Sequence, residues 1–358
     1  MMAKGPLALF FGTRPQVIKA SVLRQALGGT GSVVAVDTGQ HYDYTLHQVH
    51  YDQLGVPPPD VYLGVGSASH AEQTAAILTA AEQWIDANHP RAAVVIGDTN
   101  STLACALASA KARVPVAHVE AGLRVTDLLM AEEINRRCVD AIAALLFAPS
   151  RQAEATLRRE RADAEVHLTG DVALDVLLRA LPRVTKPERT ADEYIYVTLH
   201  RAELVDDAKL LRAVATGLAA LPLPVVFAAH PRTAAALERA GCGSSARVQQ
   251  REPVGYLESL ALLTSARAVV TDSGGIQREA YWSGVPCVTV RAETEWVETV
   301  ACGANRLVPP AQSAQLADAV EEALAVERGE WDKTAYGDGT AAERIAAILA
   351  ERFPSSSA

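Results

Sequence analysis

The sequence predicts an α/β protein with mostly parallel sheets, divided into two halves. Short apolar runs typical of buried strands alternate with longer segments of helical periodicity along the 358 residues. This alternation is typical of parallel sheets covered by helices. Residues 181–192 carry two prolines and several charges without an apolar period, so we expect them to link two domains. The expected domains are 1–180 and 193–339, followed by a C-terminal helix and tail at 340–358.

The predicted elements follow this alternation in order. The helical pattern is clearest over 71–88 and 102–112, and a last amphipathic helix is predicted over 340–352, before a frayed serine-rich end. The runs predicted as strands are 7–11, 33–36, 93–96, 115–119, 145–148, 194–199, 224–229, 266–271 and 286–290.

Composition and charge narrow the class of protein. Hydrophobic residues make up 49% and charged residues 21%, the balance of a soluble globular protein rather than a disordered or membrane one. The formal net charge of −9 opposes a nucleic-acid or anionic membrane surface, although a local arginine cluster can still bind phosphate. Five cysteines without a Cys-x-x-Cys pair suggest neither disulfides nor a zinc site, so we expect a cytoplasmic location. No stretch approaches the ~18 apolar residues of a membrane span.

Polar clusters stand directly after the predicted strands. In open α/β sheets, ligands bind outside the carboxyl ends of the strands, so clusters from both halves are expected to face each other across an interdomain cleft. Helix capping is the alternative, and for residues 99–101 it is the better explanation. It explains Arg14, Glu120 and His200 poorly. The clusters are Gly12-Thr13-Arg14-Pro15, Thr38-Gly39-Gln40-His41, Gly97-Asp98-Thr99-Asn100, residues 120–124, His200-Arg201, His230-Pro231-Arg232 and Asp272-Ser273-Gly274-Gly275.

Two of these clusters have the features of a phosphate site. After the strand at 266–271, a turn with Gly274 and Gly275 leads into a helix, so free N–H groups and the helix dipole can bind an oxyanion. After the first strand, Arg14 and Lys19 offer a guanidinium fork and a point charge. An ordinary turn and a solvated basic face are the alternatives, but the two sites together fit a nucleotide diphosphate. The first strand leads to G-T-R-P rather than G-x-G-x-x-G, and no P-loop motif occurs.

Carboxylates supply the candidate chemistry. Asp98 and Glu120 end neighbouring strands, and Glu132 opens a helical segment in which it shares a face with Arg136. Alone, such a Glu–Arg pair is more typical of a solvated helix face. Acids that converge with arginines and histidines can instead provide a proton acceptor and a proton donor, which favours acid–base catalysis.

The ordered motifs make the chain similar to the non-hydrolysing UDP-N-acetylglucosamine 2-epimerase family over nearly its full length. This resemblance implies two Rossmann-like domains facing a cleft, the glycosyltransferase-B arrangement, with the C-terminal helix crossing back to the first domain. It also implies a homodimer. The matching motifs are Gly12-Thr13-Arg14-Pro15 with Ile18-Lys19, Thr38-Gly39-Gln40-His41, Gly97-Asp98-Thr99, residues 118–124, Glu132-Glu133-x-Asn135-Arg136, His200-Arg201-x-Glu203 and residues 271–280.

The resemblance also implies the reaction and its residues. The family inverts C2 of a UDP-sugar by eliminating UDP to 2-acetamidoglucal and adding it back, without NAD, metal or another cofactor. The implied catalytic residues are Asp98, Glu120, Glu132, Arg136 and His200. The implied substrate-binding residues are Arg14, Lys19, Gln40, His41, His230, Tyr256, Ser273, Gly274, Gly275 and Glu279, of which Glu279 would bind the ribose hydroxyls.

Departures from the family pattern leave other activities open. Gln16 stands where the G-T-R-P-E motif has glutamate, and Trp296 stands where an arginine near the nucleotide is usual. The alternatives are a hydrolysing 2-epimerase that releases UDP and N-acetylmannosamine, a 2-epimerase of a UDP-diacetamido-uronate, a glycosyltransferase of the same fold, and a catalytically silent nucleotide-sugar binder. The joint presence of Asp98, Glu120 and Glu132 argues against the silent binder, because buried acids without a task are costly.

Overall fold

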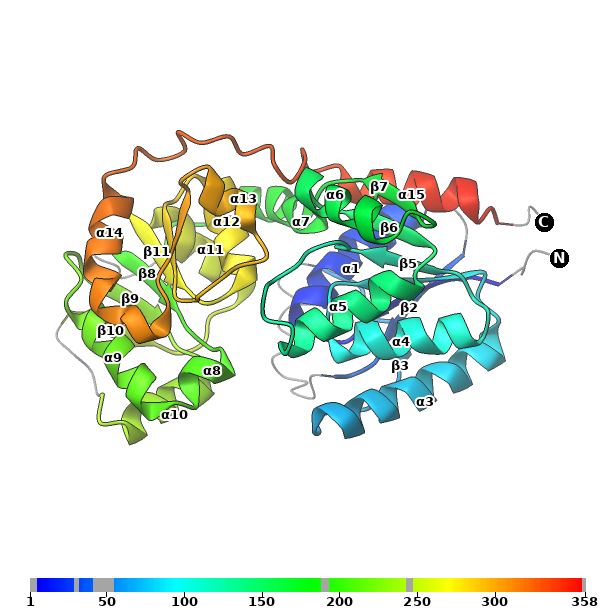
Figure 1. The fold of residues 1–358 in the computed structure, drawn as a ribbon, viewed down its shortest axis with the longest axis horizontal. Coiled ribbons are helices and arrows are strands. Elements are labelled where there is room, and N and C mark those ends of the chain that lie inside the picture. Colours follow the sequence, from blue (N-terminus) through cyan, green and yellow to red (C-terminus); the bar gives the residue numbers. More distant parts are fainter. Residues whose placement is uncertain (1–4, 29–31, 41–54, 188–192, 243–246, 356–358) are drawn as a thin grey trace. The chain divides into compact units, whose positions relative to one another are not determined.

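The chain forms two compact units in a computed structural model that describes residues 5–28, 32–40, 55–187, 193–242 and 247–355 (Figure 1). The first unit comprises residues 1–179 together with 334–358, and the second comprises residues 180–333. Each unit contains one parallel sheet flanked by helices.

The first unit is built on a seven-stranded sheet of order β3-β2-β1-β4-β5-β6-β7, in which every recorded pair is parallel. Strands β1 and β4 lie at its centre and are buried along their whole length, as expected for a sheet covered on both faces. The strands are β1 (Leu7–Phe11), β2 (Val33–Asp37), β3 (Val61–Tyr62), β4 (Ala92–Ile96), β5 (Val116–Val119), β6 (Leu145–Ala148) and β7 (Glu165–Leu168).

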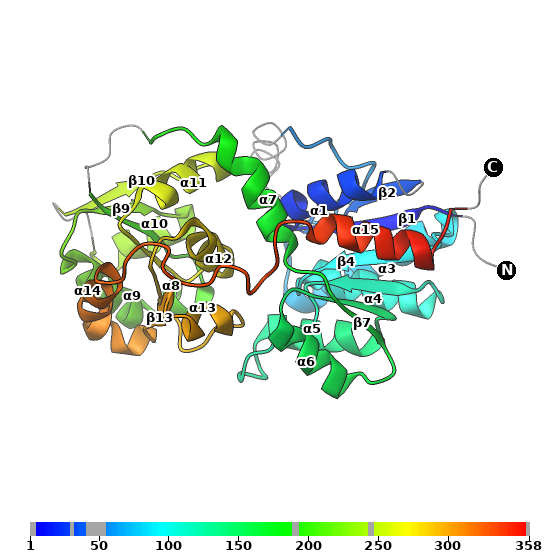
Figure 2. The ribbon, with the colours of Figure 1, turned by 90° about the horizontal axis from the view of Figure 1, so that it is seen from above.

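The helices of this unit pack in two groups. Helices α3, α4 and α5 lie side by side, whereas the C-terminal helix α15 packs against α1, as Figure 2 shows. The end of the chain therefore belongs to the same unit as its beginning. The helices are α1 (Arg14–Leu27), α3 (His70–Asn88), α4 (Asn100–Lys111), α5 (Ala131–Ile142), α6 (Arg151–Glu160), α7 (Val172–Ala180) and α15 (Ala341–Arg352).

The second unit repeats the architecture with a six-stranded parallel sheet of order β10-β9-β8-β11-β12-β13. The strands are β8 (Ile195–Thr198), β9 (Val225–Ala228), β10 (Val248–Arg251), β11 (Ala268–Thr271), β12 (Cys287–Thr289) and β13 (Asn305–Leu307). The helices are α8 (Ala202–Val205), α9 (Ala208–Ala219), α10 (Pro231–Arg239), α11 (Tyr256–Ser265), α12 (Gly274–Ser283), α13 (Val297–Ala301) and α14 (Leu316–Leu324), with short 3₁₀ helices at Leu181–Arg183 and Pro310–Gln315.

The predicted class, α/β with parallel sheets in two domains, is confirmed. Every run predicted as a strand forms one, and the predicted helices occur as α3, α4 and α15 with ends shifted by one or two residues. The sequence did not predict β3, β7, β10 and β13. All four are the outermost strands of their sheets and are only partly buried.

Candidate active site

In the first unit the predicted residues gather where three neighbouring strands end. Strands β1, β4 and β5 are adjacent, so the segments that follow them meet at one edge of the sheet. Arg14 and Lys19 lie on α1 directly after β1, and both are half-buried. Asp98 follows β4 and Glu120 follows β5. The structure thus brings two acids and two cations to one end of the sheet.

Asp98 is anchored by helix α5. Its carboxylate lies 2.5 Å from Nη2 of Arg136, a guanidinium that is only 2% exposed. Asn135 donates to the backbone carbonyl of Asp98 at 2.9 Å. The Asp98 side chain itself is 31% exposed, so it keeps access to solvent while a buried cation orients it.

Glu120 occupies an unusual backbone conformation beside the Asp98 turn. Its φ is +67°, in the left-handed region that residues with a side chain rarely adopt. Lys19 Nζ lies 2.5 Å from its carboxylate, and both side chains are largely buried. A Cβ added at Gly97 would lie 3.5 Å from Glu120 Oε2, so this carboxylate is next to the residue that precedes Asp98. Such backbone outliers cluster at functional sites, because surrounding contacts must impose them.

The adjacent glutamates of α5 differ in their surroundings. Glu133 is fully buried, accepts the N–H of Val125 at 3.1 Å, and is paired with Arg136 and Arg137. Glu132 is half-buried and has no hydrogen bond or ion pair within the described part of the chain. Arg136 pairs with Asp98 and Glu133 rather than with Glu132, the neighbour on its helix face.

Two glutamines join the loops at this edge of the sheet. Gln40 Oε1 accepts from both the N–H and the hydroxyl of Ser101, at 3.0 and 2.7 Å, so it binds the start of α4. Gln16 Oε1 accepts the N–H groups of Gly12 and Thr13, and its amide donates to the Ile96 carbonyl at 2.6 Å. A glutamate at position 16 could not donate to the Ile96 carbonyl. The glutamine that replaces the family's usual glutamate therefore adds a hydrogen bond to the end of β4. The predicted residue His41 lies outside the described residues.

In the second unit, strands β8 and β11 are neighbours, and their ends carry His200 and Asp272. Asp272 Oδ2 accepts the N–H groups of His200 and Arg201, both at 2.8 Å, and Oδ1 lies 2.9 Å from Nδ1 of the His200 ring. Burial raises the pKa of Asp272, but the ring and the two amides outweigh it and lower the pKa below its usual value. The buried carboxylate thereby orients an exposed imidazole, a role that the sequence did not reveal.

The turn after Asp272 leads into α12 and has the form of an anion site. Ser273 caps the ten-residue helix by accepting the N–H of Ile276, and Gly274 and Gly275 leave the first turn without side chains. A Cβ at Gly274 would meet Nε1 of Trp296 at 2.8 Å, so only glycine fits there. The free N–H groups and the helix dipole favour an oxyanion at such a position.

The Arg278 guanidinium lies beside this turn, although position 296 holds a tryptophan rather than the expected arginine. The Arg278 guanidinium lies 3.7 Å from the centroid of the Trp296 ring, and its Nε donates to the Gly274 carbonyl at 3.2 Å. Both side chains are buried. Sequence reasoning missed Arg278, because only the fold brings it onto the tryptophan. The stacked pair places a buried positive charge beside the glycine turn.

Of the remaining predicted residues of this unit, Tyr256 and His230 lie at helix starts and Glu279 lies within α12. Tyr256 opens α11 and hydrogen bonds to Glu279 of α12; burial and this carboxylate raise the pKa of Tyr256 well above its usual value. His230 caps α10, with Nδ1 accepting the N–H of Arg232 at 3.3 Å. Both Tyr256 and Glu279 are half-buried, and His230 is exposed.

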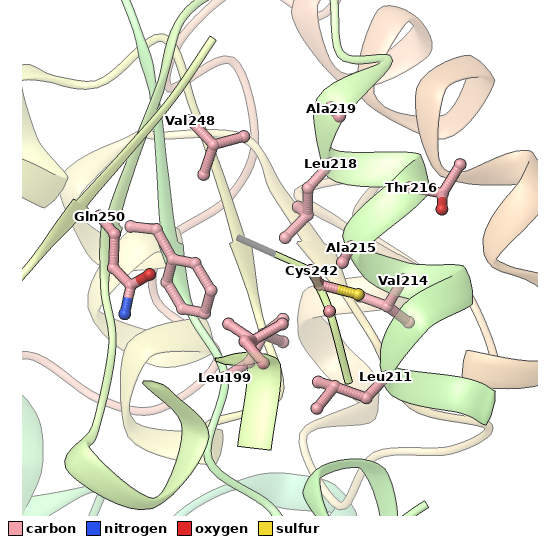
Figure 3. Close-up of a pocket in the computed structure, with 13 residues that line it drawn as sticks. Leu199, Leu211, Val214, Ala215, Thr216, Leu218, Ala219, Cys242, Val248 and Gln250 are labelled. Atoms are coloured by element: carbon pink, nitrogen blue, oxygen red, sulfur yellow. The ribbon is translucent and has the colours of Figure 1, made fainter. Parts of the chain in front are cut away.

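Two hollows among the described residues lie away from the predicted site residues. A cavity of about 310 Å³ in the second unit is lined mainly by apolar side chains of α9 and the neighbouring strands (Figure 3), and none of the predicted site residues lines it. A groove of about 510 Å³ in the first unit is lined by residues 85, 86, 89–91, 112–115 and 352–354, at the opposite end of the strands from Asp98. Neither hollow offers the carboxylates of the candidate site.

Metal and membrane features are not found in the described parts. Across the described ranges, no three His, Cys, Asp or Glu side chains converge as a metal site would require. None of the described helices combines the length and apolar character needed to cross a bilayer.

Comparison with known proteins identifies similar chains. A family model described as UDP-N-acetylglucosamine 2-epimerase matches residues 29–350. The UDP-2,3-diacetamido-2,3-dideoxy-D-glucuronate 2-epimerase of Pseudomonas aeruginosa is 43% identical over 353 residues, covering 95% of this chain and 98% of the relative. The structure of Methanocaldococcus jannaschii UDP-GlcNAc 2-epimerase in complex with UDP-GlcNAc and UDP has a TM-score of 0.91 at 38% identity, covering 97% of this chain and 99% of that chain. The calicheamicin glycosyltransferase, at 17% identity, a TM-score of 0.53 and coverage of 99% and 96%, shares the fold alone.

Proposed function

Because the chain belongs to the UDP-N-acetylglucosamine 2-epimerase family, we propose that it reversibly converts UDP-N-acetylglucosamine into UDP-N-acetylmannosamine. The observation that carries this proposal is the pair of carboxylates at one end of the first sheet, Asp98 and Glu120. Asp98 is paired with Arg136 and Glu120 with Lys19, while Glu132, at the start of α5, is half-buried and has no partner among the described residues. Proton removal and proton return at one carbon need such a pair of groups.

The proposed reaction proceeds by elimination and re-addition. The C1–O bond to UDP breaks and the C2 proton leaves, which forms the C1=C2 bond of 2-acetamidoglucal. UDP then adds back at C1 while C2 receives a proton on the opposite face. Because the C2 proton is weakly acidic, cleavage of the C1–O bond must run ahead of its removal. Stabilising the departing diphosphate is therefore the larger electrostatic task.

We assign the diphosphate to the Ser273-Gly274-Gly275 turn of the second unit, which supplies N–H groups at the start of α12. In the first unit, Arg14 and Lys19 are the proposed substrate-binding cations. The exposed His200 ring, oriented by Asp272, supplies a further donor. Glu279 would bind the ribose hydroxyls, with Tyr256 hydrogen-bonded to it, and His230 completes the proposed nucleotide contacts.

The assignment of His200 is tested by UDP binding. His200→Ala should weaken UDP binding at least ~10-fold, since a hydrogen bond to a charged group contributes about 1.5–3 kcal/mol. Titration calorimetry with UDP measures it. His89→Asn, which alters an exposed histidine at the end of α3 and suits its left-handed backbone, is the control and should bind like the parent. Unaltered UDP affinity in His200→Ala would refute the diphosphate role.

A second candidate substrate is UDP-2,3-diacetamido-2,3-dideoxy-D-glucuronate, and the Pseudomonas aeruginosa relative at 43% identity supports it. Parallel assays of both UDP-sugars, with products separated by anion-exchange chromatography, compare kcat/KM directly. The primary proposal predicts the higher kcat/KM for UDP-N-acetylglucosamine. A value at least ~10-fold higher for the diacetamido-uronate would transfer the same chemistry to that substrate. Release of free UDP and N-acetylmannosamine would instead identify a hydrolysing epimerase.

A further inference from the structure

We propose that the buried pair His118–Asp140 is a positioning device that holds the Asp98 turn and the Glu120 turn in register. The inference rests on the proposed function, because those two carboxylates are assigned to proton transfer. His118 lies on β5 and is completely buried, and Asp140 lies on α5 and is 1% exposed. Neither can touch a substrate, so both act through the residues that they bind.

Each ring nitrogen of His118 lies within hydrogen-bond distance of an oxygen atom. Nε2 lies 2.7 Å from the Gly97 carbonyl, and Nδ1 lies 2.7 Å from Asp140 Oδ1. A carbonyl has no proton to give, so Nε2–H must be the donor. The carboxylate is ionised: burial raises the pKa of Asp140, but His118 and Arg124 outweigh it and lower the pKa. The Gly97 carbonyl and the Asp140 carboxylate therefore hold the ring from its two nitrogens.

The pair reaches both catalytic turns. The carbonyl that His118 binds belongs to Gly97, the residue directly before Asp98. The other oxygen of Asp140 accepts the N–H of Gly122 at 3.1 Å, two residues after Glu120. Gly122 has φ +85°, and a Cβ there would lie 2.5 Å from the Ala153 carbonyl, so this turn cannot shift toward α6. One buried hydrogen-bonded pair thus spans the ends of β4 and β5.

The peptide at Asp98 is fixed from both sides. Its preceding carbonyl, on Gly97, accepts from His118, and its own carbonyl accepts from Asn135 at 2.9 Å. With two consecutive carbonyls bound by buried side chains, the peptide plane has little freedom, and Arg136 then directs the carboxylate. Loss of the His118 bond alone should let this turn rotate. A displacement of about 1 Å at a reacting group can cost ~100-fold in rate.

Two substitutions at His118 separate its two bonds. Glutamine places an amide N–H near the position of Nε2, so His118→Gln keeps the bond to Gly97 and loses the bond to Asp140. Asparagine places its amide near the position of Nδ1, so His118→Asn keeps the bond to Asp140 and loses the bond to Gly97. Both replacements are neutral and similar in size. The proposal predicts that kcat of His118→Asn falls at least ~10-fold below that of His118→Gln, with KM of both within ~3-fold of the parent. Equal losses in the two variants would overturn it.

A matched control and an activity-independent signal complete the test. His167 Nε2 lies 2.7 Å from Glu165 on β7, outside the candidate site, and His167→Gln should retain parental kcat. In ¹⁵N NMR of the parent protein, Nε2 of the His118 ring should carry a proton, and an Nε2 without a proton would overturn the proposal even if both His118 variants failed to fold. Absence of epimerisation by the parent with an intact Nε2–H signal would instead count against the proposed function.

Discussion

The three proposed catalytic carboxylates differ in what binds them, and this difference gives each a distinct character. Asp98 faces the buried guanidinium of Arg136, and Glu120 faces Lys19. Glu132 has no ionic or hydrogen-bonded partner among the residues described. A paired carboxylate is oriented by its cation, whereas Glu132 has no such contact among the described residues. The three groups can therefore divide proton acceptance, proton donation and orientation among themselves.

Asp98→Asn should lower kcat at least ~100-fold, the low end for loss of a positioned acid or base. The amide is nearly isosteric and can still bind Arg136, so the fold should be retained. Steady-state assays measure the effect, with Asp163→Asn as control, because Asp163 forms an exposed pair with Arg161 away from the strand ends. Near-parental turnover of a folded Asp98→Asn variant would remove Asp98 from the mechanism.

Asp272→Asn should change how stability depends on pH. The pKa of Asp272 is lowered in the folded state, so its contribution is present above the unfolded value of about 3.9 and is lost as pH falls through the folded value. The urea midpoint of the parent should therefore be higher than that of the variant at pH 6. The difference between the two midpoints should narrow below pH 4. Tryptophan fluorescence reports mainly on this unit, which contains Trp282, Trp296 and Trp331, whereas Trp84 lies in the first unit. A gap that is constant from pH 6 to pH 3 would contradict the assignment.

The sequence could locate the candidate residues but not their partners. Arg14, Asp98 and Glu120 stand directly after apolar runs, and parallel strands bring such positions together by geometry alone. The Lys19–Glu120 pair and the Asp272–His200 contact join segments about 70 to 100 residues apart, and no local pattern encodes such contacts. Glu132 and Arg136 were expected to share a helix face. That local spacing could not predict that the Arg136 guanidinium pairs with Asp98, for the same reason.

At the scale of elements, the buried central strands could be predicted from the sequence, whereas partly exposed edge strands could not. Central strands such as β1 and β4 are covered on both faces and read as continuous apolar runs. Strands β7 and β10, with the sequences EVHL and VQQR, lie at sheet edges where one side meets solvent, so polar residues interrupt the apolar pattern. These segments form strands because a neighbouring strand supplies hydrogen bonds to them. The sequence of the segment alone does not show that neighbour.

Helix α15 depends on a residue far away in sequence. Thr340 at its N-cap makes no side-chain capping bond, and Asp175 of α7 accepts the N–H groups of Ala341 and Ala342 instead, at 3.2 and 2.9 Å. Asp175→Ala should therefore destabilise the start of α15 by about 1 kcal/mol. Hydrogen exchange of the first α15 amides should accelerate ~5-fold, while α9 amides in the other unit stay unchanged. Unchanged exchange in α15 would show that Asp175 is not its cap.

At the scale of the whole molecule, the chain is two parallel-sheet units that divide the proposed tasks. The first unit carries the carboxylates and includes the final helix α15 beside α1. The second carries the glycine turn of α12, with Arg278 stacked on Trp296 next to it. Each unit places its polar residues at the carboxyl ends of its own central strands. Proton chemistry on a sugar and binding of a nucleotide diphosphate are the two functions that these sets of residues suit.

The most direct test of the central claim is a proton NMR time course of the purified protein with UDP-N-acetylglucosamine in D₂O, without added NAD or metal. Elimination and re-addition predict the appearance of UDP-N-acetylmannosamine with deuterium at C2, because the proton returned to that carbon comes from solvent. Deuterium should also enter the remaining UDP-N-acetylglucosamine as the reaction reverses. Formation of UDP-N-acetylmannosamine that retains the original C2 proton, or no conversion of this sugar or the diacetamido-uronate, would contradict the account.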